Sequence, residues 1–248
     1  MSKSRPPRIL FLTTDYPPDL GGLQTYSYRI ARSLPGGLVA GVVVGSDHPS
    51  AALPTPAAIP LRAFRGRDRL RAAVWSLRAV LLGRLHGRID CSLHMQWSTA
   101  LGPWLLAKAR RPMPYVILIH GAELLDPGRP LLARLKASVF AEAAAVVAGS
   151  HATADLFTSL GLRARRLEVI HYGNPLEAPR PSEPRRRSTG PVRILAMHRL
   201  VARKGTSLLL DSLAGLGPLD WRLDLVGRGE EETALRAQAT ALGLADRI

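Results

Sequence analysis

Short apolar runs alternate with stretches of helical spacing along most of the chain. The runs predicted as strands are 8–13, 38–45, 58–64, 91–95, 115–121, 144–150, 167–173, 192–197 and 221–227. Several are apolar on both faces, which is typical of parallel strands covered by helices. After the first run, Leu23, Ser27, Ile30, Ala31 and Leu34 fall on one face of a predicted helix. This alternation predicts a doubly wound α/β fold with right-handed crossovers.

The pattern is interrupted once and then restarts. Residues 174–191 are rich in proline, serine and charge, which is typical of a linker. The alternation resumes over 192–248, with helices predicted at 204–216 and 230–243, and "DRI" at the end resembles the lead-in to a further strand. We therefore predict a first domain over 1–173, a linker, and a second α/β domain beginning at 192. The second segment is shorter than a complete doubly wound domain usually is, so we expect it to be incomplete.

The amino-acid composition indicates which kinds of ligand and location are favoured. Lysine and arginine exceed acidic residues by 15, which favours anionic partners such as nucleotides, sugar phosphates or anionic lipid. The single cysteine, Cys91, permits no internal disulfide, and we predict a cytoplasmic location. The seven histidines lack ligand spacing, so no metal site is predicted. Aromatic residues make up only 5% and no nucleic-acid module is evident, so nucleic-acid binding is not favoured.

A basic loop follows the strand 192–197. Ligands of open α/β sheets bind beyond the carboxyl ends of the strands, where Arg199 would lie. The helix beginning near Lys204 would aim its free amides at the same place. Arg199 and Lys204 could then clamp a diphosphate, the arginine by its fork and the lysine as a point charge. The alternative is an ordinary solvated loop in an arginine-rich chain.

Two further stretches lie at predicted strand ends. Gly21 and Gly22 separate the first strand from the first helix and would let the backbone approach a phosphate or sugar closely. They form neither a dinucleotide fingerprint nor a P-loop, so a plain turn is the alternative. His120 and Glu123 follow the strand 115–121, where a histidine can contact a sugar hydroxyl or transfer a proton. A structural histidine is equally compatible with this position.

The segment 64–88 is basic and amphipathic. Val74, Trp75, Leu77, Leu81 and Leu85 can share a broad apolar face. The surrounding arginines are Arg67, Arg69, Arg71, Arg78, Arg84 and Arg88. Such a helix can lie on anionic lipid, which would place the protein peripherally on the inner face of the membrane. The alternative is a helix packed on the core with a basic outer face.

The order of these stretches along the chain carries more information than any one of them. Together, "GGLQTYSYRIARSL", "ILIHGAELL", "VAGSHATADLF", "HRLVARKGTSLLLDSL" and "VGRGEEETALRAQATALGLADRI" resemble the retaining glycosyltransferases of family 4. The resemblance covers essentially the whole chain. It implies the two-domain GT-B architecture, here a complete N-terminal Rossmann-like domain and part of a C-terminal one.

The resemblance also implies an activity and roles for residues. Sugar would pass from a UDP- or GDP-sugar to an acceptor held by the first domain, with retention of configuration and without a metal. Arg199 and Lys204 would neutralise the diphosphate, Gly21 and Gly22 would bring the backbone to phosphate or sugar, and His120 would lie beside the reacting sugar. Glu123 is a candidate contact to sugar or acceptor.

Other features qualify the resemblance. Gly227 and Gly229 bracket a predicted turn bordering the nucleotide pocket, and the glutamates at 230–232 disfavour a phosphate at the next helix. Members usually have Asn-Gly where this chain has Tyr172-Gly173. The pair of glutamates typical of the family would fall beyond Ile248, so we expect the chain alone to be poorly active. A non-catalytic or split-enzyme subunit, completed by a second chain, is the alternative.

Overall fold

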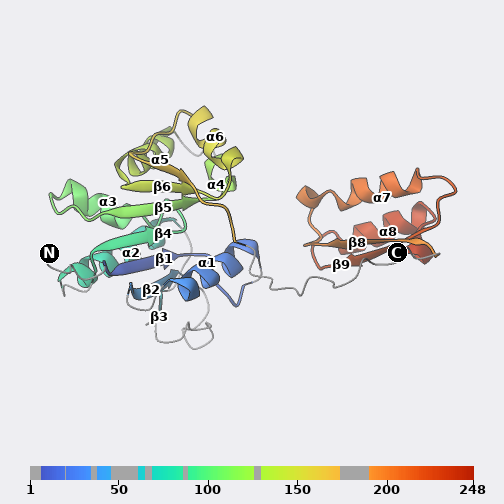
Figure 1. Cartoon of the computed structure of the whole chain (residues 1–248), viewed down its shortest axis with the longest axis horizontal. Coiled ribbons are helices and arrows are strands. Elements are labelled where there is room, and N and C mark those ends of the chain that lie inside the picture. Colours follow the sequence, from blue (N-terminus) through green and yellow to red (C-terminus); the bar gives the residue numbers. More distant parts are fainter. Residues whose placement is uncertain are drawn as a thin grey trace, which may run out of the picture. The chain divides into compact units, whose positions relative to one another are not determined.

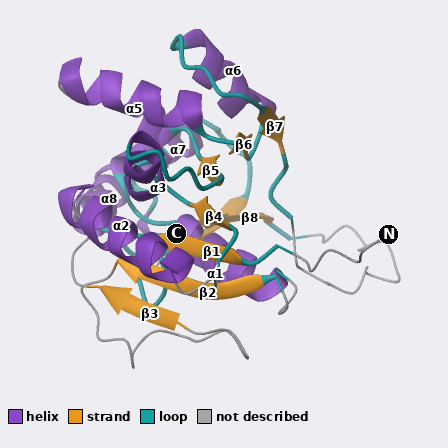
Figure 2. Ribbon diagram, turned by 90° about the vertical axis from the view of Figure 1, so that its left-hand side faces the viewer, coloured by secondary structure: helices purple, strands orange, loops and turns teal. Residues whose placement is uncertain are grey.

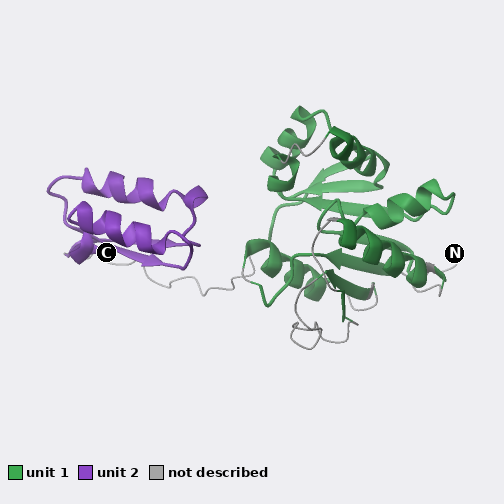
Figure 3. Ribbon diagram, turned by 180° about the vertical axis from the view of Figure 1, so that it is seen from behind, with its two compact units in different colours: residues 1–175 green, residues 176–248 purple. Residues whose placement is uncertain are grey.

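The computed structural model of the 248-residue chain describes residues 7–19, 21–34, 38–45, 61–64, 69–85, 89–125, 130–173 and 190–248. The chain divides into two compact units, Met1–Pro175 and Leu176–Ile248 (Figure 3). Almost all of the predicted linker 174–191 lies outside the described residues, as do the ends of the segments predicted at 58–64 and 64–88. Each unit is described separately.

Unit 1 is built on a parallel sheet in which the described residues form seven strands in the order β3-β2-β1-β4-β5-β6-β7 (Figure 1). These strands are β1 (Ile9–Thr13), β2 (Val39–Gly45), β3 (Leu61–Phe64), β4 (Cys91–His94), β5 (Tyr115–Ile119), β6 (Ala145–Ala148) and β7 (Leu167–Val169). Each neighbouring pair is parallel. The strand order reverses between β1 and β4, which confirms the predicted doubly wound α/β class and marks the usual place for a ligand.

Helices cover the sheet because successive strand residues point to opposite faces. The helices of unit 1 are α1 (Gly22–Ser33), α2 (Arg69–Leu85), α3 (Leu101–Lys108), α4 (Ala122–Leu125), α5 (Pro130–Glu142) and α6 (His151–Ser159). Leu10 and Leu12 of β1 pack in one buried cluster with Trp75 of α2. The intervening Phe11 packs in another cluster with Ala31 of α1. The sheet lies between helical layers, as Figure 2 shows.

Helix α2 departs from its predicted amphipathic pattern. Trp75 is buried, but Val74 and Leu85, expected on the same apolar face, have 61% and 64% of their surface exposed. The apolar residues of α2 are therefore divided between two sides, since Leu70 is also 76% exposed. No described helix is both long enough and apolar enough to cross a bilayer.

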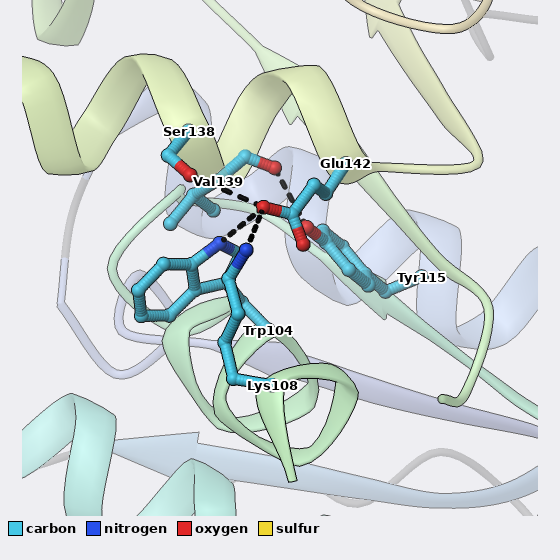
Figure 4. Close-up of polar contacts among 6 residues, drawn as sticks. All are labelled: Trp104, Lys108, Tyr115, Ser138, Val139 and Glu142. Carbon is cyan, nitrogen blue, oxygen red and sulfur yellow. Dashed lines mark hydrogen bonds and ion pairs between the residues drawn. The ribbon is translucent and has the colours of Figure 1, made fainter. Parts of the chain in front are cut away.

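The carboxylate of Glu142 accepts several hydrogen bonds near the amino end of the unit 1 sheet. Glu142, the last residue of α5, accepts hydrogen bonds at Oε1 from Lys108 Nζ (2.6 Å), Trp104 Nε1 (3.2 Å) and Ser138 Oγ (3.2 Å), as Figure 4 shows. These bonds outweigh partial desolvation and hold the pKa of Glu142 below its usual value. Beside them, Tyr115 at the start of β5 donates a hydrogen bond to the Val139 carbonyl (2.7 Å). The cluster ties α3, α5 and β5 together, far along the strands from their carboxyl ends.

Unit 2 repeats the strand–helix pattern on a smaller scale. Its elements are the parallel strands β8 (Val192–Met197) and β9 (Trp221–Val226), the helices α7 (Thr206–Ala214) and α8 (Glu232–Ala241), and the 3₁₀ helices η2 (Ala202–Lys204) and η3 (Ala245–Arg247). Trp221 is fully buried in the core that α7 and α8 cover. Near the end of the chain, where "DRI" was expected to lead into a further strand, residues Ala245–Arg247 form η3, and the Arg247 guanidinium lies over the Trp221 ring, 4.1 Å from its centroid. The side chains of Leu195 and Met197 on β8 are 65% and 73% exposed.

Candidate functional site

Three neighbouring strands of unit 1 end at the same edge of the sheet. β1, β4 and β5 are parallel, so the residues that follow them meet at their carboxyl ends. Asp15, Gln96 and His120 are these residues, and α1 starts at the same edge. The sequence analysis identified only His120 among the three.

Asp15 is held by two amide side chains. Gln24 Nε2 donates to its Oδ1 (2.9 Å) and Gln96 Nε2 donates to its Oδ2 (2.5 Å). Gln96 is itself oriented, because its Oε1 accepts from the backbone N–H of Thr14 (3.0 Å). The backbone N–H of Asp15 donates to Thr13 Oγ1 (3.0 Å). These contacts hold a half-buried carboxylate in one orientation at the sheet edge.

The two glycines before α1 differ in what surrounds them. A Cβ atom on Gly21 would collide with Oε1 of Gln24, so a glycine here makes room for the amide that holds Asp15. A Cβ atom on Gly22 would meet nothing within 4 Å. No side chain caps α1, and no acidic residue lies in its first turn. The surroundings of Gly22 are thus compatible with a close backbone approach to a ligand, whereas a side chain at 21 would displace the end of Gln24.

His120 and Glu123 come together as the sequence predicts. The backbone N–H of His120 donates to Glu123 Oε1 (2.6 Å), which closes the turn after β5. Burial lowers the pKa of the imidazole, although Glu123, Asp15 and the backbone of Met95 oppose that effect. Among the described residues, Nε2 is a buried atom without a hydrogen-bond partner of good geometry. His120 therefore favours the neutral form at this edge.

Tyr172 covers His120 from the end of the segment that follows β7. Its hydroxyl lies 2.7 Å from His120 Nδ1, and the two rings are stacked with centroids 6.1 Å apart. Tyr26 of α1 packs edge-on against both rings. A Cβ atom on Gly149 would collide with the Tyr172 ring, so the ring lies directly over that glycine. Tyr172 stands where the family resemblance leads one to expect an asparagine, and it contacts the candidate catalytic histidine.

His94 lies beneath this edge and has a structural role. It is fully buried, with Nδ1 3.0 Å from Thr99 Oγ1 and Nε2 2.8 Å from Ser92 Oγ. Desolvation lowers its pKa to about 3, although a hydrogen bond that the ring donates to the Thr99 backbone opposes this effect. Both ring nitrogens are satisfied within the fold, so His94 is not available to a ligand.

The basic loop of unit 2 lies between β8 and α7. Arg199, Arg203 and Lys204 are exposed, and within residues 190–248 neither Arg199 nor Lys204 forms an ion pair. Gly205 adopts the left-handed conformation (φ 68°, ψ 26°) that glycine favours, and α7 begins directly after it without a side-chain cap. Unpaired cations therefore lie beside a free helix N-terminus, which is a favourable setting for an anion.

Gly227 and Gly229 are required by the backbone. A Cβ atom at either would collide with a carbonyl oxygen of the loop after β8, that of His198 or that of Leu200. Gly227 lines a cavity of about 520 Å³ with a mixed polar and apolar lining, whereas Gly229 does not line it. Neither Arg199 nor Lys204 lines this cavity. The cations of the basic loop therefore lie outside the cavity, although Leu200 of the same loop lines it.

The starts of α6 and α8 differ from that of α7. Ser150 accepts a hydrogen bond from the backbone N–H of Thr153 (3.2 Å), so it caps α6. Helix α8 begins at Glu232, two residues later than the sequence predicts, and Glu232 pairs with Arg236 (3.1 Å). Acidic charge at this start disfavours an anion there, in contrast to α7.

The sequence analysis missed Asp15, Gln24, Gln96, Tyr26 and Tyr172. Asp15 and Gln96 follow strands closely, so their position at a sheet edge was a usable signal. Nothing in the local sequence indicates that Tyr172 contacts His120, 52 positions away. Among the described residues, no group of three or more histidine, cysteine or acidic side chains could hold a metal ion.

Comparisons with known proteins identify the family. The sequence profile of Glycosyltransferase Family 4 matches residues 20–178. The chain belongs to glycosyltransferase family 4. A sequence comparison with curated proteins gives no match.

Solved structures of this family's fold align with nearly the whole chain. Anabaena Alr3699/HepE in complex with UDP aligns with a TM-score of 0.71 at 23% identity, over 97% of this chain and 67% of that one. Sucrose-phosphate synthase from Thermosynechococcus elongatus gives 0.72 at 14%, over 97% and 69%. The apo form of the lipopolysaccharide outer core galactosyltransferase WaaB gives 0.66 at 14%, over 97% and 66%. The chain thus has the GT-B fold and spans about two thirds of the length of these structures.

Proposed function

We propose that this family 4 glycosyltransferase moves a sugar from a nucleotide-sugar donor to an acceptor, with retention of anomeric configuration. The observation that carries the proposal is the pair of exposed cations, Arg199 and Lys204, beside the uncapped start of α7. UDP in the complex of Anabaena HepE, a protein of similar fold, supports a nucleotide donor.

The chemistry of the basic loop suits a departing nucleoside diphosphate. Negative charge develops on the diphosphate as the bond to the sugar breaks, and fixed cations stabilise that charge. Arg199 would bind phosphate oxygens through its planar fork and Lys204 as a point charge. Two such cations can stabilise the departing diphosphate in the way that a divalent metal does in other enzymes. The proposed reaction therefore includes no metal. In unit 1, the open surroundings of Gly22 would accept a phosphate or sugar against the backbone.

His120 would act on the reacting sugar. Because burial lowers its pKa, the imidazole is neutral near pH 7 and can exchange hydrogen bonds with a sugar hydroxyl. Glu123 fixes the backbone of His120 and Tyr172 engages its Nδ1, so the ring is held in place before a substrate arrives. A preoriented ring requires little rearrangement in the transition state.

Nucleotide binding by the 248-residue chain tests the role of the loop. Titration calorimetry with UDP and GDP should show that Lys204→Ala and Arg199→Ala each weaken binding by about one to two decades, the value of a charge-assisted contact. Arg203→Ala removes the same charge from the same loop and is the matched control. Equal losses in all three variants would mean that net charge, and not a specific clamp, attracts the nucleotide.

The alternative function is a subunit completed by a second chain. The chain spans about two thirds of the length of the matched structures. An assay of this chain alone with UDP- and GDP-sugars and a panel of lipid and small-molecule acceptors separates the two proposals. Robust turnover without any other protein would exclude the split-enzyme alternative.

Helix α2 supports peripheral contact with an anionic membrane as part of this function. Leu70, Val74 and Leu85 are exposed on α2, and Arg71 and Arg78 are exposed between them. Apolar side chains entering the lipid interface and cations at its headgroups would act together. Co-sedimentation with anionic vesicles should fall when Leu70 and Leu85 are changed to serine. Leu131→Ser on α5, where the leucine is 79% exposed, is the control, and equal binding to neutral vesicles would refute the contact.

A further inference from the structure

The hydroxyl of Tyr172 covers one ring nitrogen of the candidate catalytic histidine. It lies 2.7 Å from Nδ1 of His120. We propose that Tyr172 is a positioning residue whose hydroxyl donates to Nδ1 and holds the proton of the neutral imidazole on Nε2. Nδ1 is then the atom with which His120 accepts a hydrogen bond from a substrate hydroxyl. This inference rests on the proposed function and specifies which ring nitrogen acts and what determines it.

The phenol ring of Tyr172 is held over the imidazole by its packing. The two rings stack with an interplanar angle of 17° and centroids 6.1 Å apart. Tyr26 packs edge-on against Tyr172, with 4.6 Å between the ring centroids. On another side the ring lies against Gly149, where a Cβ atom would collide with it. The hydroxyl therefore stays at Nδ1 because its ring is fixed, and not only because of the hydrogen bond itself.

Both partners of this hydrogen bond are neutral. Burial raises the pKa of the Tyr172 phenol, and Tyr26 and Glu123 raise it further, so the hydroxyl keeps its proton. Burial lowers the pKa of His120, so the imidazole has one N–H and one nitrogen with a free lone pair. Two arrangements are then possible. Either the phenol donates to Nδ1, or Nδ1–H donates to the phenol oxygen.

The surroundings of the other ring nitrogen decide between them. The backbone of Met95 raises the pKa of the imidazole through a hydrogen bond. The N–H of Met95 is already donated to the Leu12 carbonyl (3.1 Å), so the Met95 carbonyl is the group that acts on the ring. A carbonyl only accepts, so the nitrogen that faces it carries the proton.

That nitrogen is Nε2, because Nδ1 lies against Tyr172. The contact of Nε2 with the Met95 carbonyl is an attraction of poor alignment, since Nε2 has no hydrogen-bond partner of good geometry among the described residues. It still favours a proton on Nε2 over a lone pair there. Tyr172 and Met95 thus select the same tautomer from opposite sides of the ring.

The accessibility of the two nitrogens indicates which one a substrate can use. Nε2 is buried, so a ligand arriving from solvent does not reach it. Tyr172, which covers Nδ1, is 47% exposed, so the ring is open to a ligand on that side. A substrate hydroxyl would replace the phenol hydroxyl as donor to Nδ1, while the proton stays on Nε2. His120 then requires no change of tautomer when the substrate binds.

NMR of the 248-residue chain labelled with heavy nitrogen in its histidines tests the assignment. A long-range proton–nitrogen correlation spectrum at about pH 8, where the imidazole is neutral, distinguishes protonated from unprotonated ring nitrogens by their chemical shifts. The signals of His120 are those missing from His120→Gln. In the wild type, Nε2 should give the protonated signal and Nδ1 the unprotonated one.

Tyr172→Phe keeps the ring over Gly149 and removes only the hydroxyl. The ratio of the two tautomers should fall about fivefold, which corresponds to the loss of a hydrogen bond of about 1 kcal/mol. The two nitrogen signals should therefore move towards each other. Tyr26→Phe is the matched control, because it removes a hydroxyl from the other tyrosine that packs against His120, and it should leave both signals in place. Thermal unfolding of each variant confirms that it is folded.

Three outcomes would overturn the proposal. The first is a proton on Nδ1 in the wild type, and the second is unchanged nitrogen signals in Tyr172→Phe. The third is an equal change in Tyr172→Phe and Tyr26→Phe, which would mean that ring packing, and not the hydroxyl, determines the tautomer. The spectra are recorded without nucleotide, so they are independent of the proposed function. If Lys204→Ala leaves UDP binding unchanged, the diphosphate clamp is wrong while the tautomer assignment stands.

Discussion

The carboxyl edges of the two sheets have the same geometry and opposite chemistry. In unit 1, half-buried carboxylates are held by amides and lie beside neutral and aromatic rings. In unit 2, exposed cations without ion pairs lie at an uncapped helix start. One strand–turn–helix design can therefore present carboxylates or cations at the carboxyl ends of its strands, depending on which few side chains follow them. Four changes, to single residues or to the pH, test the two units separately.

The largest effect should follow from Trp221→Ala. The indole is fully buried in a cluster made only of unit 2 residues, and removal of such a ring costs about 3–5 kcal/mol. That loss is large for so small a unit. Hydrogen exchange measured by mass spectrometry should show loss of protection in 192–248 while β1, β4 and β5 stay protected. Equal loss in both units would contradict their independence.

Acid should weaken unit 1 through His94. Its folded pKa of about 3 lies below the unfolded value of 6.5, so the unfolded chain binds an extra proton between these pH values. The stabilisation is complete above pH 6.5 and is lost as pH falls, at up to about 1.4 kcal/mol per pH unit. Urea unfolding from pH 6.5 to 4.5 should show a shallower slope for His94→Gln than for wild type. Identical slopes would mean that His94 is not the group responsible.

A smaller effect contrasts a capped helix with the open start of α7. Ser150→Ala removes the hydrogen bond to the Thr153 N–H at the start of α6 and should lower the free energy of unfolding by about 1 kcal/mol. Ser159→Ala at the other end of α6, where the hydroxyl only donates to the Leu156 carbonyl, is the control. Denaturant titration measures both, and the cap should cost more.

The smallest effect concerns the ion pair between Lys108 and Glu142. Lys108 is 53% exposed and Glu142 27%, so solvent screens their attraction. Lys108→Met should change the free energy of unfolding by less than about 1 kcal/mol, since Trp104 and Ser138 still donate to Glu142. A loss above 2 kcal/mol in urea would show that the lysine anchors the cluster.

The sequence predicted the sheet closely and the site only in part. Strand 192–197 matches β8 at both ends, and His120 with Glu123 form the expected turn after β5. Val74 and Leu85 of α2 are not buried together with Trp75 as their spacing suggested. Helical spacing shows which residues share a face, but it does not show which part of the helix surface packs on the neighbouring strands. Asp15 was missed because its role depends on Gln96, 81 positions away, and only the parallel pairing of β1 with β4 brings them together.

The contact of Tyr172 with Gly149 makes two distant positions depend on each other in evolution. A larger residue at 149 would require the Tyr172 ring to move away from its present position or to be replaced. Conversely, a chain with a small residue at 172 no longer requires the glycine. An alignment of homologues should therefore show these two positions varying together, and loss of the tyrosine should coincide with relaxed selection at 149 rather than at 120.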